Sequence, residues 1–342
     1  MNTPILVTGG AGYIGSHTCK ALASAGFCPV TFDNLVAGNR WSVKWGPLVH
    51  GDLSDRSSLE EVIYRYGIEA VIHFAAYAYV GESMQDPGKY FQNNVVNTVN
   101  LLEALKATAV RQIVFSSTCA VYGVPERIPI SEDHATRPIN PYGESKLFIE
   151  RALSWYGSAH GFRSVSLRYF NAAGADPDGD IGESHDPETH LMPLVIQAAL
   201  GKRPHLTVYG SDYPTPDGTA IRDYIHVTDL AEAHVQSLTC LLNGGESATL
   251  NLGTGTGHSV REVISAVERL SGKRFTVIET ARRPGDPPVL IADATRSGEV
   301  LHWSPRFSSL ESIVKTAWRW HERAPDTCGT LSKERILATS RI

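Results

Sequence analysis

Short, mainly apolar runs alternate with longer amphipathic segments over the first half of the chain. Four runs are typical of strands buried on both faces of a parallel sheet, at 5–8, 30–32, 71–74 and 113–116. Four segments between and after them have the apolar spacing of helices, at 13–25, 57–66, 89–108 and 142–160. Strands and helices that alternate in this way predict an α/β fold with a Rossmann-like, doubly wound parallel sheet.

The pattern changes after a further strand predicted at 164–170. The stretch 171–223 is rich in Pro, Gly, Asp and His, with one helical segment near 191–200. Helical spacing returns at 229–242 and 310–321, and a strand is predicted at 250–252. We therefore expect a smaller α+β substrate-binding domain beside the main sheet. The predicted boundaries are 1–170 with returning segments near 226–255 for the main domain, and 171–225 with 256–342 for the smaller one.

Composition and charge narrow the class of protein. The 342 residues include 31 Lys+Arg and 36 Asp+Glu, a net charge of −5, and they contain no basic block. Nucleic acid and anionic membranes are therefore not expected as partners. No segment reaches the roughly 20 apolar residues of a membrane span, and the beginning lacks a secretory signal pattern. The five cysteines are scattered, as is typical of free thiols in a reducing compartment, so a cytoplasmic location is predicted.

A glycine-rich loop follows the first predicted strand. Gly9, Gly12 and Gly15 form a GxxGxxG pattern at the start of a predicted helix. Glycines there let the backbone approach a pyrophosphate, which the helix N-terminus then stabilises. Asp33 ends the next strand, where a carboxylate binds adenosine ribose hydroxyls and repels a 2′-phosphate. The cofactor predicted from these residues is NAD.

Tyr142 and Lys146 lie one turn apart on a predicted helix. A neighbouring cation stabilises a phenolate, so we expect Lys146 to lower the pKa of Tyr142 toward the working pH. Tyr142 is then a candidate acid/base for a sugar or alcohol hydroxyl. Thr118 leaves a predicted strand at its carboxyl end, where open sheets bind ligands, and it could hydrogen-bond the same hydroxyl.

Longer motifs support a family resemblance. They include VTGGAGYIGSHT, FDNL, VIHFAA, VGES, NNV, FSSTCAVYG, PYGESK, LRYFN, DGTAIRDYIHV, NLGTG and RRPGD. In these motifs the chain resembles the extended short-chain dehydrogenase/reductases and, among them, the UDP-glucose 4-epimerase family. The resemblance implies an isomerase of galactose and carbohydrate metabolism. It would epimerise C4 of UDP-glucose and UDP-galactose reversibly with NAD, through a 4-keto intermediate and with Tyr142 as acid/base.

The resemblance also implies roles for individual residues. The catalytic residues would be Tyr142, Lys146 and Thr118. The residues that would bind the cofactor are Gly9, Gly12, Tyr13, Ile14, Gly15, Asp33, Asn34, Asp52, Leu53, Phe74, Ala75, Ala76, Asn93, Tyr142, Lys146 and Phe170. Those that would bind the UDP-sugar are Thr118, Tyr142, Asn171, Leu191, Tyr209, Arg222, Arg283, Asp286 and Leu290. Two arginines suit a diphosphate because guanidinium groups make bidentate, permanently charged contacts.

Three positions depart from the family pattern. No lysine follows Ala76, where the family offers a cofactor contact, and His190 replaces a common asparagine. Leu290 stands where a tyrosine excludes N-acetyl sugars and a small residue admits them. A UDP-arabinose/UDP-xylose 4-epimerase and a UDP-N-acetylglucosamine 4-epimerase therefore remain alternatives. A 4,6-dehydratase is disfavoured because Cys119 and Ala120 occupy the positions of its Asp-Glu pair.

Two further features have simpler interpretations. The segment from His185 to His190 resembles a set of metal ligands, but Pro187 breaks a helix and the spacing matches no HExxH motif. We expect a loop near the substrate and no metal site. In related enzymes the helices at 89–108 and 142–160 form a homodimer interface. An apolar stripe of Val95, Val99, Leu102 and Leu105 fits that role, although it could equally face its own sheet.

Overall fold

Seven parallel strands form the central sheet of the computed structural model, which describes residues 3–283 and 286–323. Their order is β10-β6-β5-β4-β1-β2-β3, so the direction of winding reverses between β1 and β4. The strands are β1 (Pro4–Thr8), β2 (Cys28–Asp33), β3 (Leu48–His50), β4 (Ala70–His73), β5 (Gln112–Thr118), β6 (Arg163–Tyr169) and β10 (Ala248–Leu252). The predicted Rossmann-like, doubly wound sheet is confirmed, and a reversal of this kind marks where such sheets bind ligands.

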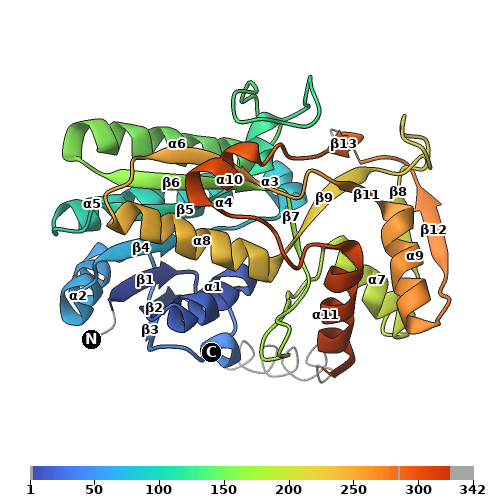
Figure 1. Ribbon diagram of the computed structural model, residues 1–342, viewed down its shortest axis with the longest axis horizontal. Helices are drawn as coiled ribbons and strands as arrows, with labels where there is room; N and C mark the ends of the chain where they lie inside the picture. The colour runs from blue at the N-terminus through green and yellow to red at the C-terminus, as the bar shows by residue number, and fades with distance from the viewer. Residues whose placement is uncertain (1–2, 284–285, 324–342) are drawn as a thin grey trace, which may run out of the picture.

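Helices cover both faces of this sheet (Figure 1). One face packs against α1 (Tyr13–Ser24) and α8 (Val227–Leu242), which bury Ile5 and Val7. The other face, which includes Leu6, packs against α2 (Arg56–Tyr66), α5 (Asn97–Lys106) and α6 (Pro141–His160). Neighbouring residues of β1 thus enter opposite apolar cores, which explains why the predicted strands are apolar at consecutive positions.

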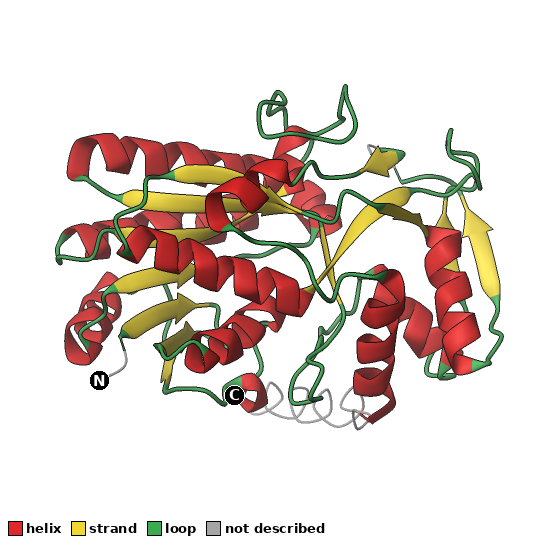
Figure 2. Ribbon diagram, viewed as in Figure 1, coloured by secondary structure: helices red, strands yellow, loops and turns green. Residues whose placement is uncertain are grey.

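A second group of elements lies beyond the carboxyl ends of the main strands (Figure 2). Strand β9 (Ile221–His226) pairs with β11, β13 and β7, while β8 pairs with β12. Helices α7, α9 and α11 enclose a third apolar core. The bounds are β7 (Asn171–Ala173), β8 (Leu206–Tyr209), β11 (Gly257–Ser259), β12 (Val277–Thr280), β13 (Val289–Leu290), α7 (Leu191–Ala199), α9 (Val260–Ser271) and α11 (Leu310–Arg323). Helix α10 (Thr295–Leu301) instead packs on the main sheet, where Leu301 lies in the same apolar core as Ile5 and Val7.

Two sequence-based expectations need correction. The stretch 171–223 contains β7, β8 and the beginning of β9, three short strands whose partners lie far along the chain. The single helix expected at 89–108 consists of α4 (Pro87–Tyr90), a π-helical turn at Phe91–Val96 and α5. A separate short helix, α3 (Val80–Gln85), precedes them.

Two of the four residues in the apolar stripe proposed as an interface pack inside their own chain. Leu102 and Leu105 are fully buried against the sheet of their own chain, so they cannot face a partner.

The last part of the predicted smaller domain, 324–342, lies outside the described residues. In the described ranges, no helix has both the length and the apolar character that a membrane crossing requires.

Candidate active site

The glycine loop connects β1 to α1 with very little space around it. Gly9 has a φ of +74°, and a Cβ atom on it would lie 2.6 Å from the amide nitrogen of Ala75. A Cβ atom on Gly15 would lie 2.3 Å from the carbonyl oxygen of Gly9. Only glycine therefore allows the loop to lie against both the start of α1 and the end of β4.

The beginning of α1 offers backbone donors to an anion. Gly12 is the N-cap residue, no side chain caps this end, and the first turn contains no acidic residue. The first amides of a helix, here those of Tyr13 and Ile14, have no acceptor within the helix and lie at its positive end. The residues present therefore fit the pyrophosphate of a dinucleotide.

The carboxyl ends of β2 and β3 supply the predicted adenosine residues. The Asp33 carboxylate is buried and accepts hydrogen bonds from the Ala11 amide at 3.0 Å and the Leu35 amide at 2.8 Å. Burial raises the pKa of Asp33, and these two amides oppose that shift. Asn34 Nδ2 donates to Asp52 Oδ2 at 2.7 Å, and Leu53 is buried directly after Asp52. Four predicted residues, Asp33, Asn34, Asp52 and Leu53, thus lie at one edge of the sheet.

The end of β4 approaches the same loop. The amides of Phe74 and Ala75 both donate to the Thr8 carbonyl, at 2.9 and 3.1 Å, and Ala76 follows directly. Asn93 lies in the π-helical turn and donates to Asn94 Oδ1 at 3.0 Å.

Asn94 lies in the NNV motif but was not predicted as a site residue. Its buried amide hydrogen-bonds the backbone N–H and C=O of Tyr77, at 2.8 and 3.0 Å, and the Ser145 hydroxyl at 3.1 Å. Asn94 therefore joins the chain after β4 to α6, and π-helical turns of this kind occur frequently at functional sites.

The three predicted catalytic residues meet at the carboxyl end of β5. Thr118 is the last residue of β5, and its hydroxyl hydrogen-bonds Tyr142 and accepts from the Ala120 amide at 3.1 Å. Asn140 caps α6 by accepting from the Gly143 amide at 2.8 Å, which places Tyr142 in the first turn. Lys146 Nζ donates to the carbonyl oxygen of Ser116 at 2.7 Å and lies 6.0 Å from the centre of the Tyr142 ring.

The electrostatics of this group differ from the expectation. Burial raises the pKa of Tyr142 to about 12, and the hydrogen bond from Thr118 only partly opposes this. Burial also lowers the pKa of Lys146 to about 7, against the opposing charge of Glu150. The prediction that Lys146 lowers the pKa of Tyr142 is therefore wrong for the protein groups by themselves, because desolvation dominates both pKa values and neither group is among those that shift the other.

The predicted substrate residues gather around β9. Asn171 on β7 pairs with Tyr224 of β9, and Leu290 on β13 pairs with Arg222 of β9. Arg222 forms an ion pair with Asp286 and a 2.7 Å hydrogen bond to the carbonyl oxygen of its own neighbour, Ile221. Both contacts orient the guanidinium and leave it further N–H donors.

The remaining predicted substrate residues lie on separate elements. The Arg283 guanidinium stacks 4.0 Å from the ring centre of Tyr209, at the end of β8. Leu191 is the first residue of α7. Leu290 packs beside an apolar cluster that contains Phe170, and Cys119 packs against the same cluster. This cluster lies between the carboxyl end of β5, where Thr118 is, and strand β13, which contains Leu290.

A buried ion pair below the catalytic residues was not predicted. Arg168 on β6 and Glu150 on α6 lie 2.6 Å apart, with side chains 8% and 7% exposed. Ser117 donates to the Glu150 carboxylate, and Arg168 donates to the Tyr122 hydroxyl at 3.0 Å. The only signal in the sequence is the spacing of Glu150 one turn after Lys146, which is equally typical of an exposed helix surface.

A family profile and individual relatives both match this chain to epimerases. Residues 5–253 match the sequence profile of the NAD dependent epimerase/dehydratase family. The chain is 52% identical to a UDP-glucose 4-epimerase of Rhizobium meliloti (strain 1021) over 322 residues, covering 94% of this chain and 98% of that protein.

Solved structures show the same relationship. A UDP-glucose 4-epimerase from Brucella ovis in complex with NAD has a TM-score of 0.91 and 52% identity, over 93% of this chain and 98% of that one. A UDP-glucose-4-epimerase from Stenotrophomonas maltophila, with bound NAD and formylated UDP-arabinopyranose, has a TM-score of 0.90 and 40% identity. That match covers 94% of this chain and 98% of the other.

Proposed function

Because the chain belongs to the NAD dependent epimerase/dehydratase family, we propose that it is an enzyme that interconverts UDP-glucose and UDP-galactose with NAD as cofactor. The observation that supports this most directly is the meeting of Thr118, Tyr142 and Lys146 at the carboxyl end of β5. That group lies in the same sheet as the glycine loop after β1, with β4 between the two strands. The reaction would serve galactose metabolism.

Tyr142 would exchange a proton with the hydroxyl on C4 of the hexose. The Thr118 hydroxyl fixes the phenol oxygen through a hydrogen bond, and the Ser116 carbonyl fixes the Lys146 ammonium. NAD, when bound, supplies the reversible oxidation at C4 and a positive charge near the phenol. Such a charge is needed because the surrounding protein raises the pKa of Tyr142 to about 12, too high for a base at neutral pH.

Inversion at C4 requires the sugar to present both faces in turn while the nucleotide stays bound. Arg222, Arg283 and Tyr209 would hold the UDP part, since the two guanidinium groups match a diphosphate. Asp286 already orients Arg222, and Tyr209 already orients Arg283. Pre-oriented cations lose less conformational entropy on binding, so affinity concentrates on UDP and leaves the hexose free to turn.

Substitution of Tyr142→Phe tests this proposal. The variant should retain NAD and UDP but lose about 100-fold to 10,000-fold in kcat, the usual contribution of a positioned acid/base. Tyr156→Phe is the matched control, because it removes a hydroxyl on the same helix that donates to Glu103 instead. Epimerase activity within a few-fold of the native value in Tyr142→Phe would reject the role of Tyr142.

The size of Leu290 supports an unsubstituted hexose as the preferred sugar. Leu290 packs against the apolar cluster that contains Phe170 and Ala292, and Cys119 packs against the same cluster. A side chain of this size leaves less room for an N-acetyl group than a small residue would. The pentose and N-acetylhexosamine alternatives are separated by comparing turnover of UDP-xylose, UDP-galactose and UDP-N-acetylgalactosamine.

We further propose that the enzyme is a cytoplasmic homodimer. Phe148 and Trp155 lie two turns apart on α6, with 52% and 74% of their surface exposed, and Phe91 is exposed on the adjacent π-helical turn. Apolar side chains grouped in this way are typical of interaction surfaces. A Trp155→Glu variant that remains dimeric by light scattering at micromolar concentration would reject this interface.

A further inference from the structure

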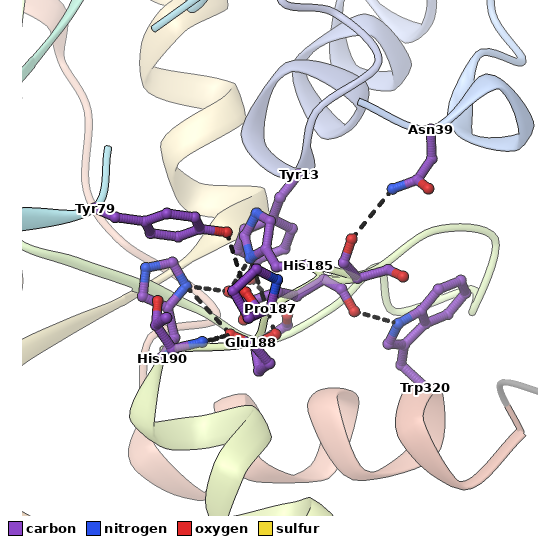
Figure 3. A network of polar contacts seen from close by, with 12 residues as sticks. Tyr13, Asn39, Tyr79, His185, Pro187, Glu188, His190 and Trp320 are labelled. Atoms are coloured by element: carbon purple, nitrogen blue, oxygen red, sulfur yellow. Dashed lines mark hydrogen bonds and ion pairs between the residues drawn. The ribbon is translucent and has the colours of Figure 1, made fainter. Parts of the chain in front are cut away.

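The chain between β7 and α7 brings two carboxylates and two imidazoles together (Figure 3). The four residues are Glu183, His185, Glu188 and His190, and each offers one donor atom within 4.8 Å of all the others. None of them belongs to the group around Tyr142, so the catalytic mechanism does not account for this cluster.

Three of the distances between these atoms resemble those in a coordination shell, and one pair is joined by a hydrogen bond. His185 Nδ1 lies 3.2 Å from Glu183 Oε1 yet outside hydrogen-bond geometry, and 3.9 Å from Glu188 Oε2. His190 Nδ1 contacts Glu183 Oε1 directly and lies 3.8 Å from Glu188 Oε1. Donor atoms about 2.0–2.2 Å from a tetrahedral zinc ion stand roughly 3.3–3.6 Å apart, close to the three longer distances. The direct contact between His190 and Glu183 would have to open when the ion enters.

Surrounding residues hold the ligands in place. Glu188 Oε1 accepts hydrogen bonds from the amides of Thr189 and His190 at 2.8 and 2.9 Å, which fixes the orientation of its carboxylate.

The backbone between the ligands is fixed from three other elements. The Tyr79 hydroxyl donates to the Pro187 carbonyl at 3.3 Å, and Trp320 Nε1 of α11 donates to the Glu183 carbonyl at 2.9 Å. Asn39 donates to the Ser184 carbonyl at 3.2 Å. A supporting shell of hydrogen bonds around the ligands is a usual property of metal sites in proteins.

Burial and charge favour a divalent cation. The side chains of Glu183 and Glu188 are only 3% and 6% exposed, so two negative charges lie almost out of water. The two carboxylates raise the pKa of His185 and of His190, so a dication would displace the imidazole protons and then balance the remaining charge of −2. Imidazole ligands favour zinc over calcium or magnesium, which prefer oxygen ligands. We propose that Glu183, His185, Glu188 and His190 bind one Zn²⁺ ion, which fastens the segment before α7.

The structure contains a second acidic cluster that serves as a comparison. Asp176, Asp178 and Asp180 also lie close together, but the Lys20 ammonium is within 2.8, 2.7 and 3.0 Å of their carboxylates. That cluster has a cation from its own chain, whereas the Glu/His cluster contains only groups that can act as metal ligands. The comparison provides a control variant of similar chemistry in a nearby segment.

The metal content of the purified chain tests the zinc site directly, and this test does not depend on the proposed function. The purified full chain, equilibrated with Zn²⁺ and then dialysed against metal-free buffer, should retain about one zinc ion per chain by inductively coupled plasma mass spectrometry. His185→Gln and Glu188→Gln should each weaken zinc binding by at least about tenfold, as measured by competition with a chelating dye. Asp178→Asn should bind zinc like the native chain.

Two outcomes would overturn the proposal. One is a native chain that retains no zinc, a result that does not depend on whether any variant folds. The other is equal zinc affinity in His185→Gln, Glu188→Gln and Asp178→Asn, because the ion would then lie elsewhere. In support, removing zinc with a chelator should lower the melting temperature of the native chain more than that of Glu188→Gln.

Discussion

Glu150 and Arg168 provide the sharpest test of the packing below the active site. Two charge-assisted hydrogen bonds join them, Nη2 to Oε2 at 2.6 Å and Nε to Oε1 at 2.9 Å, and both side chains are more than nine-tenths buried. The charge of Glu150 also opposes the burial that lowers the pKa of Lys146. Glu150→Gln keeps the shape of the side chain but leaves a buried guanidinium without its counter-charge.

The expected loss follows from this burial. Removing one partner of a buried pair costs about 3–5 kcal/mol in the free energy of unfolding, against a total of roughly 5–15 kcal/mol for a typical protein. The double variant Glu150→Gln/Arg168→Met leaves no unpaired charge. Its loss should therefore be smaller than the sum of the single losses, by about 2 kcal/mol or more. Urea denaturation of the four proteins measures both quantities.

An exposed pair of the same kind is the control. Arg56 Nε and Glu60 Oε1 lie 2.7 Å apart, but their side chains are 46% and 40% exposed. Glu60→Gln should therefore cost about 0–1 kcal/mol. If Glu150→Gln costs no more than Glu60→Gln, or if the double variant loses the sum of the single losses, desolvation of the buried pair is not the dominant effect.

Three further predictions concern the cofactor loop, the sugar site and a thiol. Gly15→Ala places a Cβ atom 2.3 Å from the Gly9 carbonyl oxygen, so activity should fall by about 100-fold and less NAD should copurify. If this variant copurifies with as much NAD as the native protein, the glycine loop does not bind the cofactor as proposed. Leu290→Ala should raise turnover of UDP-N-acetylgalactosamine relative to UDP-galactose by about tenfold, and an unchanged ratio by chromatography would contradict the proposed place of Leu290. Burial raises the pKa of Cys119 to about 12, so its thiolate is scarce at pH 7 and increases as the pH rises. At pH 7 the native protein and Cys119→Ser should therefore release nearly the same amount of thiolate from Ellman's reagent. One additional thiol that reacts rapidly in the native protein at pH 7 would contradict the burial of Cys119.

The first half of the fold could be predicted because local sequence determines it. Most main strands are short apolar runs, and the helices α1 and α2 have a clear apolar spacing, so β1, α1, β2 and α2 agree with the prediction within one or two residues. The three-residue edge strand β3 was not predicted. The glycine loop is equally local, since Gly9 and Gly15 are required by contacts with the backbone of the loop itself and the end of β4.

The rest depends on contacts between distant parts of the chain. Strand β7 has only three residues and exists because it pairs with β9, some 50 residues further along, which no local pattern reveals. The partner of Glu150 lies on a different element, so its burial was not predictable from the helix alone. The pKa of Tyr142 was predicted with the wrong sign because the sequence shows its neighbour Lys146 but not the desolvation of both groups.

The most direct test of the proposed epimerisation is to incubate the purified protein with UDP-galactose, with no NAD added, and to separate the UDP-sugars by chromatography. We expect UDP-glucose to appear, because the enclosed glycine loop retains NAD during purification and the cofactor is regenerated in each turnover. UDP-galactose that remains unchanged even after NAD is added would contradict the proposed reaction and the role of Tyr142 in it. Conversion of UDP-xylose alone would replace the hexose with a pentose as substrate.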